Sequence, residues 1–164
     1  MSLPWARLWA FVALFAILQT AYISIGSGRI ERFVVEQLTV GGAALLLNWF
    51  DPGSAVVAQG ARLSAPGGGL HVREGCEGTD VALLLSSALL VSSLPWRQRL
   101  LGVAAGLLLV FVLNQLRMLA LFQAYRHHRQ FFELLHGTLL PLVMVLVAAA
   151  FYLFWVGRSV PLRR

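Results

Sequence analysis

Four apolar runs of membrane length constrain this chain more than any other feature of its sequence. They cover residues 8–25, 78–96, 100–122 and 138–156, each near the roughly 20 residues that a helix needs to cross a bilayer. The composition agrees, because 59% of the 164 residues are hydrophobic and only 12% are charged. Soluble domains normally keep about a quarter of their residues charged. The sequence therefore predicts an all-α integral membrane protein with four transmembrane helices, which we treat as a single membrane domain over residues 1–164.

The first run, 8–25, also has features of a secretory signal peptide. Arg7 precedes it, and Gly26-Ser27-Gly28 follows it with small residues. However, the run is long for the apolar part of a signal peptide, and no Ala-x-Ala cleavage site closes it. We therefore expect the first run to remain as an uncleaved membrane anchor.

The distribution of charge predicts the orientation in the membrane. The net charge is +6, and all 13 basic residues are arginine. One side of the runs carries arginines and no acidic residue, whereas all seven carboxylates fall on the other side. By the positive-inside rule, both termini and the turn at 95–99 are cytoplasmic, and segments 26–76 and 123–136 face outward. The flanking arginines are Arg7, Arg97, Arg99, Arg158, Arg163 and Arg164.

This charge pattern also predicts the location and excludes one class of partner. Basic residues that cluster at the ends of apolar runs indicate a multi-pass protein of the cytoplasmic (inner) membrane. They do not form the basic patch on a water-facing domain that binds nucleic acid, so no nucleic-acid partner is expected.

The outward segment 26–76 is the only sizeable part expected in water. In its first half, residues 29–50, apolar side chains recur at helical spacing, which predicts an amphipathic helix at the membrane surface. Gly41-Gly42 is expected to interrupt this helix.

The second half of the outward segment carries signals for turns and strands. Turn residues occur at 51–53 and 67–69, and short β-prone stretches occur at 55–58 and 70–72. This pattern predicts a small β-hairpin packed over the membrane surface.

Three reactive or charged side chains are expected at the same outer depth. Cys76 is the only cysteine, at the outer, N-terminal end of run 78–96, where the helix dipole favours a thiolate. Arg117 follows Leu100 in an outward-running helix, with a rise of about 25 Å between them. His136 immediately precedes the last run, which returns inward. These three residues therefore reach the outer membrane boundary from three different helices.

Each of the three residues also has a purely structural explanation. A lone cysteine at a helix end is often a small apolar filler, and a lone histidine at an interface is often a hydrogen-bonded bystander. Arg117 could form an ion pair with Asp80 or Glu77, or extend to the headgroups. An unpaired arginine within an apolar run costs at least ~2.5 kcal/mol, so Arg117 indicates a functional site most strongly.

The chain resembles the exosortase/archaeosortase family of membrane cysteine transpeptidases. The resemblance rests on Glu-Gly-Cys76-Glu-Gly at the head of one run, Asn114-x-x-Arg117 in the next and His136 opening the last. It covers about residues 50–157. The short length and the Pro95-Trp96-Arg97 turn are similar to the compact single-module members, such as exosortase H.

The resemblance implies a sortase-like reaction. Members cut near a C-terminal sorting tail on secreted proteins, which consists of a recognition motif, one transmembrane helix and a basic cluster, and pass the protein to a surface acceptor. Carried over to this chain, Cys76 is the nucleophile, His136 the general acid/base and Arg117 the oxyanion stabiliser, supported by Asn114 one turn away. The expected partners are the sorting tail and membrane lipid, and no cofactor or metal is implied.

These residue types suit that chemistry. Thiolate attack on a peptide carbonyl forms an oxyanion, and losing one fixed donor to it typically costs about 10²–10³ in rate. Arginine stays protonated, and histidine exchanges protons near neutral pH. The resulting thioester can pass to an acceptor nucleophile, or to water, in which case the enzyme is a protease.

The acidic surroundings of Cys76 oppose easy activation of the thiol. Glu74 and Glu77 flank it and Asp80 follows one turn later, and nearby negative charge raises the pKa of a thiol. Either Arg117 and His136 neutralise these carboxylates, or the carboxylates point elsewhere. We expect Asp80 to orient one of these two basic residues.

Two other functions compete with this one. The first is an intramembrane metal site at His127, His128, Glu133 and His136, although Glu-x-x-His occurs only once and di-iron bundles use it twice. The second is a non-catalytic membrane adaptor, in which Arg117 is only an interhelical ion pair and Cys76 is replaceable.

Small residues in the third run offer a surface for close helix packing. They either contact the transmembrane helix of a substrate tail or, as we expect more strongly, pack against other helices of this chain. They are Gly102, Ala104, Ala105 and Gly106.

Overall fold

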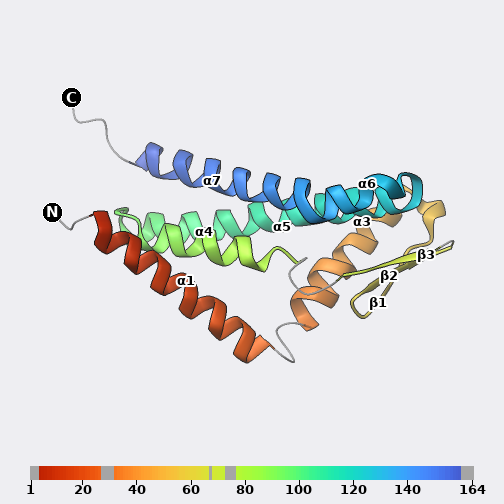
Figure 1. Ribbon diagram of the computed structural model, residues 1–164, viewed down its shortest axis with the longest axis horizontal. Coiled ribbons are helices and arrows are strands. Elements are labelled where there is room, and N and C mark those ends of the chain that lie inside the picture. The colour runs from red at the N-terminus through yellow and green to blue at the C-terminus, as the bar shows by residue number, and fades with distance from the viewer. Residues whose placement is uncertain (1–3, 27–31, 67, 73–76, 160–164) are drawn as a thin grey trace.

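The computed structural model describes residues 4–26, 32–66, 68–72 and 77–159. Helices dominate this part of the chain and a small antiparallel sheet accompanies them, as predicted (Figure 1). The helices are α1 (Pro4–Gly26), η1 (Arg32–Gly41), α3 (Gly42–Phe50), η2 (Pro52–Ser54), α4 (Thr79–Val91), α5 (Trp96–His127), α6 (Arg129–Leu134), η3 (Leu135–Leu139) and α7 (Leu140–Ser159). The strands are β1 (Val57–Gln59), β2 (Arg62–Ala65) and β3 (Gly68–His71).

Helices α1, α4, α5 and α7 form one half of the molecule. Within it, α4 packs against all three of the others, and α5 packs against α7. The N-terminal end of α1, the C-terminal end of α7 and the turn between α4 and α5 lie at the same end of the molecule (Figure 1). The arginine-flanked ends of the helices are therefore gathered in space as well as in the sequence.

Two glycines of α5 pack within this helical half. A Cβ at Gly102 would lie 2.6 Å from Nε1 of Trp155 in α7, and one at Gly106 would lie 2.9 Å from Cδ2 of Leu85 in α4. Neither position has room for a side chain. The glycines of this run therefore serve packing within the chain, which is the stronger of the two expectations.

Four helical stretches are long and apolar enough to cross a membrane, namely residues 5–24, 32–50, 96–127 and 129–158 of the described chain. Helix α4 has 13 residues and is shorter than the predicted run 78–96. It ends early because the hydroxyl of Ser92 binds the carbonyl of Leu89 at 2.6 Å, and Arg99 of α5 binds the carbonyls of Leu90 and Leu94 at 2.7 Å.

Helices η1 and α3 form one continuous helix, so the predicted interruption at Gly41-Gly42 is wrong. Gly42 allows a close approach to α5, since a Cβ there would lie 3.2 Å from the side-chain oxygen of Gln115. Nε2 of Gln115 also donates a hydrogen bond to the carbonyl of Leu38 at 2.9 Å. Gly42 thus marks where this helix contacts α5 rather than where it ends.

The sheet has three strands in the order β1-β2-β3, all antiparallel, where the sequence predicted a two-stranded hairpin. The unpredicted strand, β2, carries a single strongly apolar side chain, Leu63, which gives too weak an alternation to be recognised. Strand β3 begins inside the predicted turn 67–69. Gly68 has a φ of +143° there, and a Cβ would lie 3.2 Å from the ring of Tyr125.

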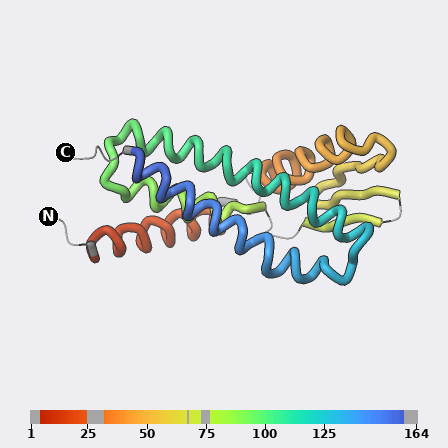
Figure 2. Tube along the Cα trace, turned by 90° about the horizontal axis from the view of Figure 1, so that it is seen from above, coloured from red at the N-terminus to blue at the C-terminus, as the bar shows by residue number. Residues whose placement is uncertain are grey.

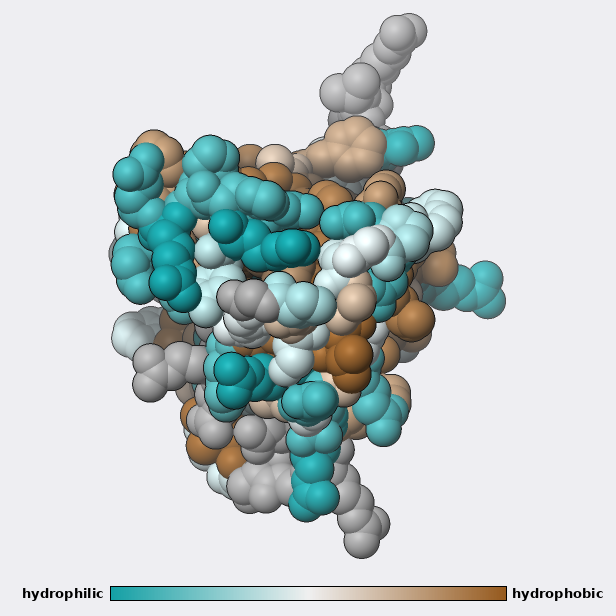
Figure 3. Space-filling view, turned by 90° about the vertical axis from the view of Figure 1, so that its right-hand side faces the viewer, coloured by the Kyte–Doolittle hydropathy of each residue, from teal (hydrophilic) through white to brown (hydrophobic). Residues whose placement is uncertain are grey.

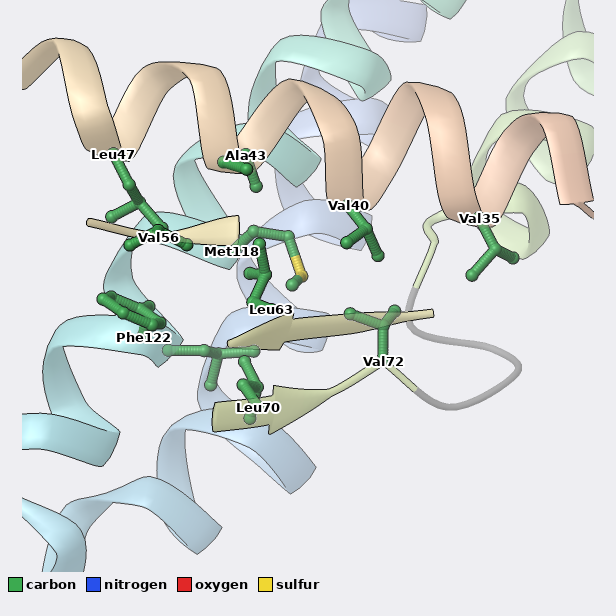
Figure 4. Packing of buried hydrophobic residues seen from close by; sticks show 12 residues of the cluster. Val35, Val40, Ala43, Leu47, Val56, Leu63, Leu70, Val72, Met118 and Phe122 are labelled. Atoms are coloured by element: carbon green, nitrogen blue, oxygen red, sulfur yellow. The ribbon is translucent and has the colours of Figure 1, made fainter. Parts of the chain in front are cut away.

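The core of this second half lies between the sheet, the η1–α3 helix and the C-terminal part of α5 (Figure 4). Leu63, Leu70 and Val72 of the sheet region are buried against Val40 of η1 and Met118 of α5. We call η1, α3 and β1–β3 the cap. Because open sheet edges do not occur in the hydrocarbon of a bilayer, the sheet of the cap belongs outside it.

Helix α5 joins the two halves of the molecule, and Figure 2 shows it running nearly the whole length. Its 32 residues give a rise of about 48 Å, which exceeds the roughly 30 Å of hydrocarbon in a bilayer. The C-terminal part of α5 therefore extends into the cap. Figure 3 looks onto this end of the molecule and shows hydrophilic side chains around an apolar area.

Candidate active site

Helix α5 carries two buried polar side chains one turn apart, Asn114 and Arg117. They are 2% and 7% exposed. The start of α4 lies against this part of α5, since a Cβ at Gly78 would be 3.4 Å from Oδ1 of Asn114. The sequence pattern Asn-x-x-Arg thus brings two polar groups to one buried face, beside the residues that follow Cys76.

Gly78 is required at the start of α4 for two reasons. Its φ is +76°, a left-handed conformation that side chains other than glycine rarely adopt. A Cβ would also approach Cε of Met144 in α7 to 3.0 Å. The glycine therefore allows α4 to begin in direct contact with both α5 and α7.

Arg117 is a buried cation without a carboxylate partner among the described residues. Its Nη2 donates a long hydrogen bond of 3.5 Å to the main-chain carbonyl of His136, and its Nη1 lies 3.9 Å from Sδ of Met144. Its Nε has no hydrogen-bond partner within the described part of the chain. An ion pair with Asp80 or Glu77 is therefore not what holds Arg117 in place.

The two acidic residues instead face α1. Oδ1 of Asp80 accepts a hydrogen bond from Nε2 of Gln19 at 2.7 Å, and Oε1 of Glu77 accepts one from the hydroxyl of Tyr22 at 3.3 Å. Asp80 thus has a different partner from the one expected, which was Arg117 or His136. Glu77 and Asp80 thus point toward α1, whereas Glu74 lies outside the described residues.

His136 lies in η3, a π-helical turn between α6 and α7. Its ring stacks on that of Phe132, with centroids 5.5 Å apart and planes 4° from parallel. The ring is half-buried and lines a cavity beside β3. The predicted meeting of Arg117 with His136 thus occurs, through the main-chain carbonyl of the histidine.

The four residues of the alternative metal site do not come together. Glu133 and His136 line the cavity beside β3, whereas His127 and His128 line a different cavity, between α5 and the α6–α7 segment. Across the described ranges, no group of three or more His, Cys, Asp or Glu side chains is placed to hold a metal ion. The metal-site alternative therefore has no geometric support.

Comparison with known families agrees with this arrangement. The family model of the transmembrane exosortases matches residues 1–156, nearly the whole chain. This chain belongs to the transmembrane exosortase family. The match extends the resemblance seen over residues 50–157 to α1 and the η1–α3 helix. Comparisons with curated proteins and with solved structures gave no match.

Membership of the exosortase family, together with its long apolar helices, makes the chain a multi-pass membrane protein. Cys76 lies outside the described residues, so the position of its thiol is not part of this geometry. The two residues that follow it, Glu77 and Gly78, are described, and they lie where α4 meets Asn114 and Met144.

The sequence reasoning missed two residues of this exosortase that bind the acidic groups near Cys76. Gln19 and Tyr22 are polar, lie in an otherwise apolar run, and are three residues apart, which places them on one face of α1. That spacing was the available signal. It could not identify their partners, because the contact with α4 joins residues more than 50 positions apart.

Proposed function

We propose that this exosortase is a membrane cysteine transpeptidase. It cleaves the C-terminal sorting tails of secreted proteins at the outer face of the cytoplasmic membrane, and it transfers them through a thioester to a surface acceptor. The observation that carries this proposal is Arg117, a buried cation with an unused donor at the contact of α4, α5 and η3.

In the proposed reaction, the thiolate of Cys76 attacks the carbonyl carbon of the scissile peptide bond and forms a tetrahedral oxyanion. The carbon–nitrogen bond then breaks, His136 gives a proton to the leaving amine, and the acyl group remains on sulfur as a thioester. His136 next takes a proton from the acceptor nucleophile, which attacks the thioester and releases the thiolate.

Arg117 suits the role of oxyanion stabiliser. Buried polar groups are normally hydrogen-bonded, so each exception calls for an explanation. Among the described residues, Nε of Arg117 and Oδ1 of Asn114 are both buried without a hydrogen-bond partner. A fixed cation in a site with little water stabilises developing negative charge strongly, and a substrate would use these groups.

The partners of the acidic residues support an active thiolate. Gln19 and Tyr22 bind the carboxylates of Asp80 and Glu77 on the side of α1. These two carboxylates therefore do not form an ion pair with Arg117. The guanidinium therefore remains available to the substrate. A cation close to a thiol also favours the thiolate form.

The proposed topology places the cap outside and the arginine-flanked helix ends in the cytoplasm. A sorting tail that crosses the membrane as one helix then presents its recognition motif beside the start of α4. Its basic cluster lies at the cytoplasmic end, where this chain's own arginines would repel it. Apolar helix contacts and the cap are therefore the expected sources of specificity.

Co-expression with a tail-bearing secreted protein tests this function, by determining the mass of the processed product. The wild type should release a product carrying an added amine or lipid, and Cys76→Ala should release none. A water-terminated product would indicate a protease instead. Unchanged processing by Cys76→Ser would contradict cysteine catalysis and favour the adaptor function.

A further inference from the structure

A groove lies along one edge of the cap sheet. It has a volume of about 270 Å³, and one wall consists of the consecutive residues 69–72 of β3 and its end. Met118, Leu121 and Tyr125 of α5 line it, as do Phe132 and His136. The groove is therefore shared between the sheet edge and the histidine to which we assign acid/base chemistry.

Strand β3 is an edge strand with main-chain groups directed away from the sheet. The N–H of Val72 donates to the carbonyl of Ala61 at 2.8 Å, and Leu70 lies opposite Leu63. Since hydrogen-bonding direction alternates along an antiparallel strand, Leu70 bonds to β2, and Gly69 and His71 point their N–H and C=O groups outward. No other strand of the described chain pairs with this edge.

The edge strand also carries no proline or lysine. Natural sheets block their edges with charged residues, proline or bulges, because a free edge pairs readily with another chain. The residues of β3 are Gly68, Gly69, Leu70 and His71, with neither proline nor lysine. Gly69 itself is needed for pairing with β2, since a Cβ there would lie 2.5 Å from the main-chain oxygen of Leu63.

We infer that the recognition segment of the substrate tail binds in this groove as an added fourth strand along β3. This inference rests on the proposed function and names how its substrate is held. The occupant follows from continuity with the reacting residues, since His136 lines the groove and Cys76 follows Val72 by only four positions in the sequence. A peptide lying along β3 is thereby led to the acid/base residue.

The direction of the added strand also follows from the fold. Strand β3 runs from the outer end of the cap toward α4 (Figure 1). In the proposed topology, a substrate chain also runs from the outside toward the membrane, so it would pair parallel to β3. Main-chain hydrogen bonds would then supply affinity, and alternate side chains entering the groove would supply specificity.

Proline substitution at each free edge provides a matched pair of variants. His71→Pro removes an outward N–H from β3. Ala58→Pro does the same on β1, because Leu63, its partner on β2, bonds to β3 and leaves the N–H of Ala58 facing outward. His71→Ala removes the side chain but keeps the main-chain N–H, so it is the reference for His71→Pro. Processing of the tail-bearing protein should be roughly tenfold lower in His71→Pro than in His71→Ala, because the proline loses one main-chain hydrogen bond to the added strand. Ala58→Pro should process it like the wild type.

Equal effects of the two prolines, or no effect of either, would overturn the inference. Processing by the wild type in the same membranes reports on the proposed function separately. If the wild type processes the tail and His71→Pro does so equally well, only the added strand is wrong. If the wild type does not process it, the inference falls together with the function.

Disulfide trapping tests the same geometry without catalysis, and it does not depend on the folding of a proline variant. Cys76→Ala removes the single cysteine, so His71→Cys in that background leaves one thiol on the full-length protein. Single cysteines are then placed at successive positions of the substrate's recognition segment. An extended strand predicts cross-links at every second position. Uniform cross-linking, or none, would contradict binding as a strand.

Discussion

The guanidinium of Arg117 donates a hydrogen bond to the main-chain carbonyl of His136 over 3.5 Å, and this contact ties the middle of α5 to the turn before α7. It uses only one of the donors of the arginine. The contact leaves Nε of Arg117 without a hydrogen-bond partner among the described residues. This unused donor is why we propose that Arg117 acts on the substrate.

Replacing Arg117 should separate activity from stability. Because the cation is buried without an ion pair, Arg117→Met should leave the melting temperature in detergent equal or higher. Processing of a tail-bearing substrate should fall by about 10²–10³, the usual cost of losing an oxyanion donor. Arg126→Ala is the control. Arg126 is an exposed residue further along α5, so this variant should process the substrate like the wild type. If Arg117→Met had a much lower melting temperature but processed the substrate normally, Arg117 would have a structural role and not a catalytic one.

Substituting Gly78 should disturb the start of α4. Gly78→Ala places a methyl group 3.0 Å from Cε of Met144 at a φ of +76°. We expect the free energy of unfolding to fall by about 1–2 kcal/mol, the cost of a left-handed conformation, and processing to fall with it. Gly157→Ala is a suitable control because nothing lies within 4 Å of its added Cβ. Processing by Gly78→Ala at the wild-type rate would show that the position of α4 does not matter.

The polar residues of α1 should tune the reactivity of Cys76. Tyr22→Phe and Gln19→Leu release Glu77 and Asp80 from their hydrogen bonds, and more mobile negative charge near a thiol raises its pKa. Alkylation of Cys76 by a membrane-impermeant maleimide should therefore slow near neutral pH and recover at higher pH. Gln130→Leu is the control, because Gln130 is an exposed residue of α6. Cys76 should be alkylated in this variant at the wild-type rate. Faster alkylation of the α1 variants would contradict this role.

Cysteine accessibility should distinguish the two ends of the molecule. In the Cys76→Ala background, Gln59→Cys in the cap should react with an impermeant maleimide added to intact cells. Ser93→Cys in the turn between α4 and α5 should react only after the membrane is opened. Labelling of both cysteines from outside, or of neither, would contradict the proposed orientation. It would also show that α4 does not cross the membrane between positions 59 and 93.

The sequence was enough to predict most of the helical half and the proximity of Arg117 to His136, two candidate site residues. Long apolar runs identified α1, α5 and α7, because membrane helices are specified by length and composition rather than by distant contacts. Helix rise alone placed Arg117 at the depth of His136. Both inferences depend on local properties of the chain.

The remaining features depend on contacts between residues far apart in the sequence. Gly41-Gly42 has the composition of a helix break, yet the helix continues because α5 fills the space beside it with Gln115. Strand β2 forms because it pairs on both sides, although its own pattern is weak. The hydrogen bond from Gln19 to Asp80 was not predicted for the same reason, since Gln19 lies 61 positions earlier in the chain.

The intact mass of the exosortase, after incubation in membranes with a tail-bearing substrate, tests the central claim most directly. We predict an adduct on Cys76 equal to the substrate portion before the cleavage site, removed by hydroxylamine as a thioester and absent from Cys76→Ser. Continued processing by Cys76→Ser, without any adduct on the wild type, would contradict the account.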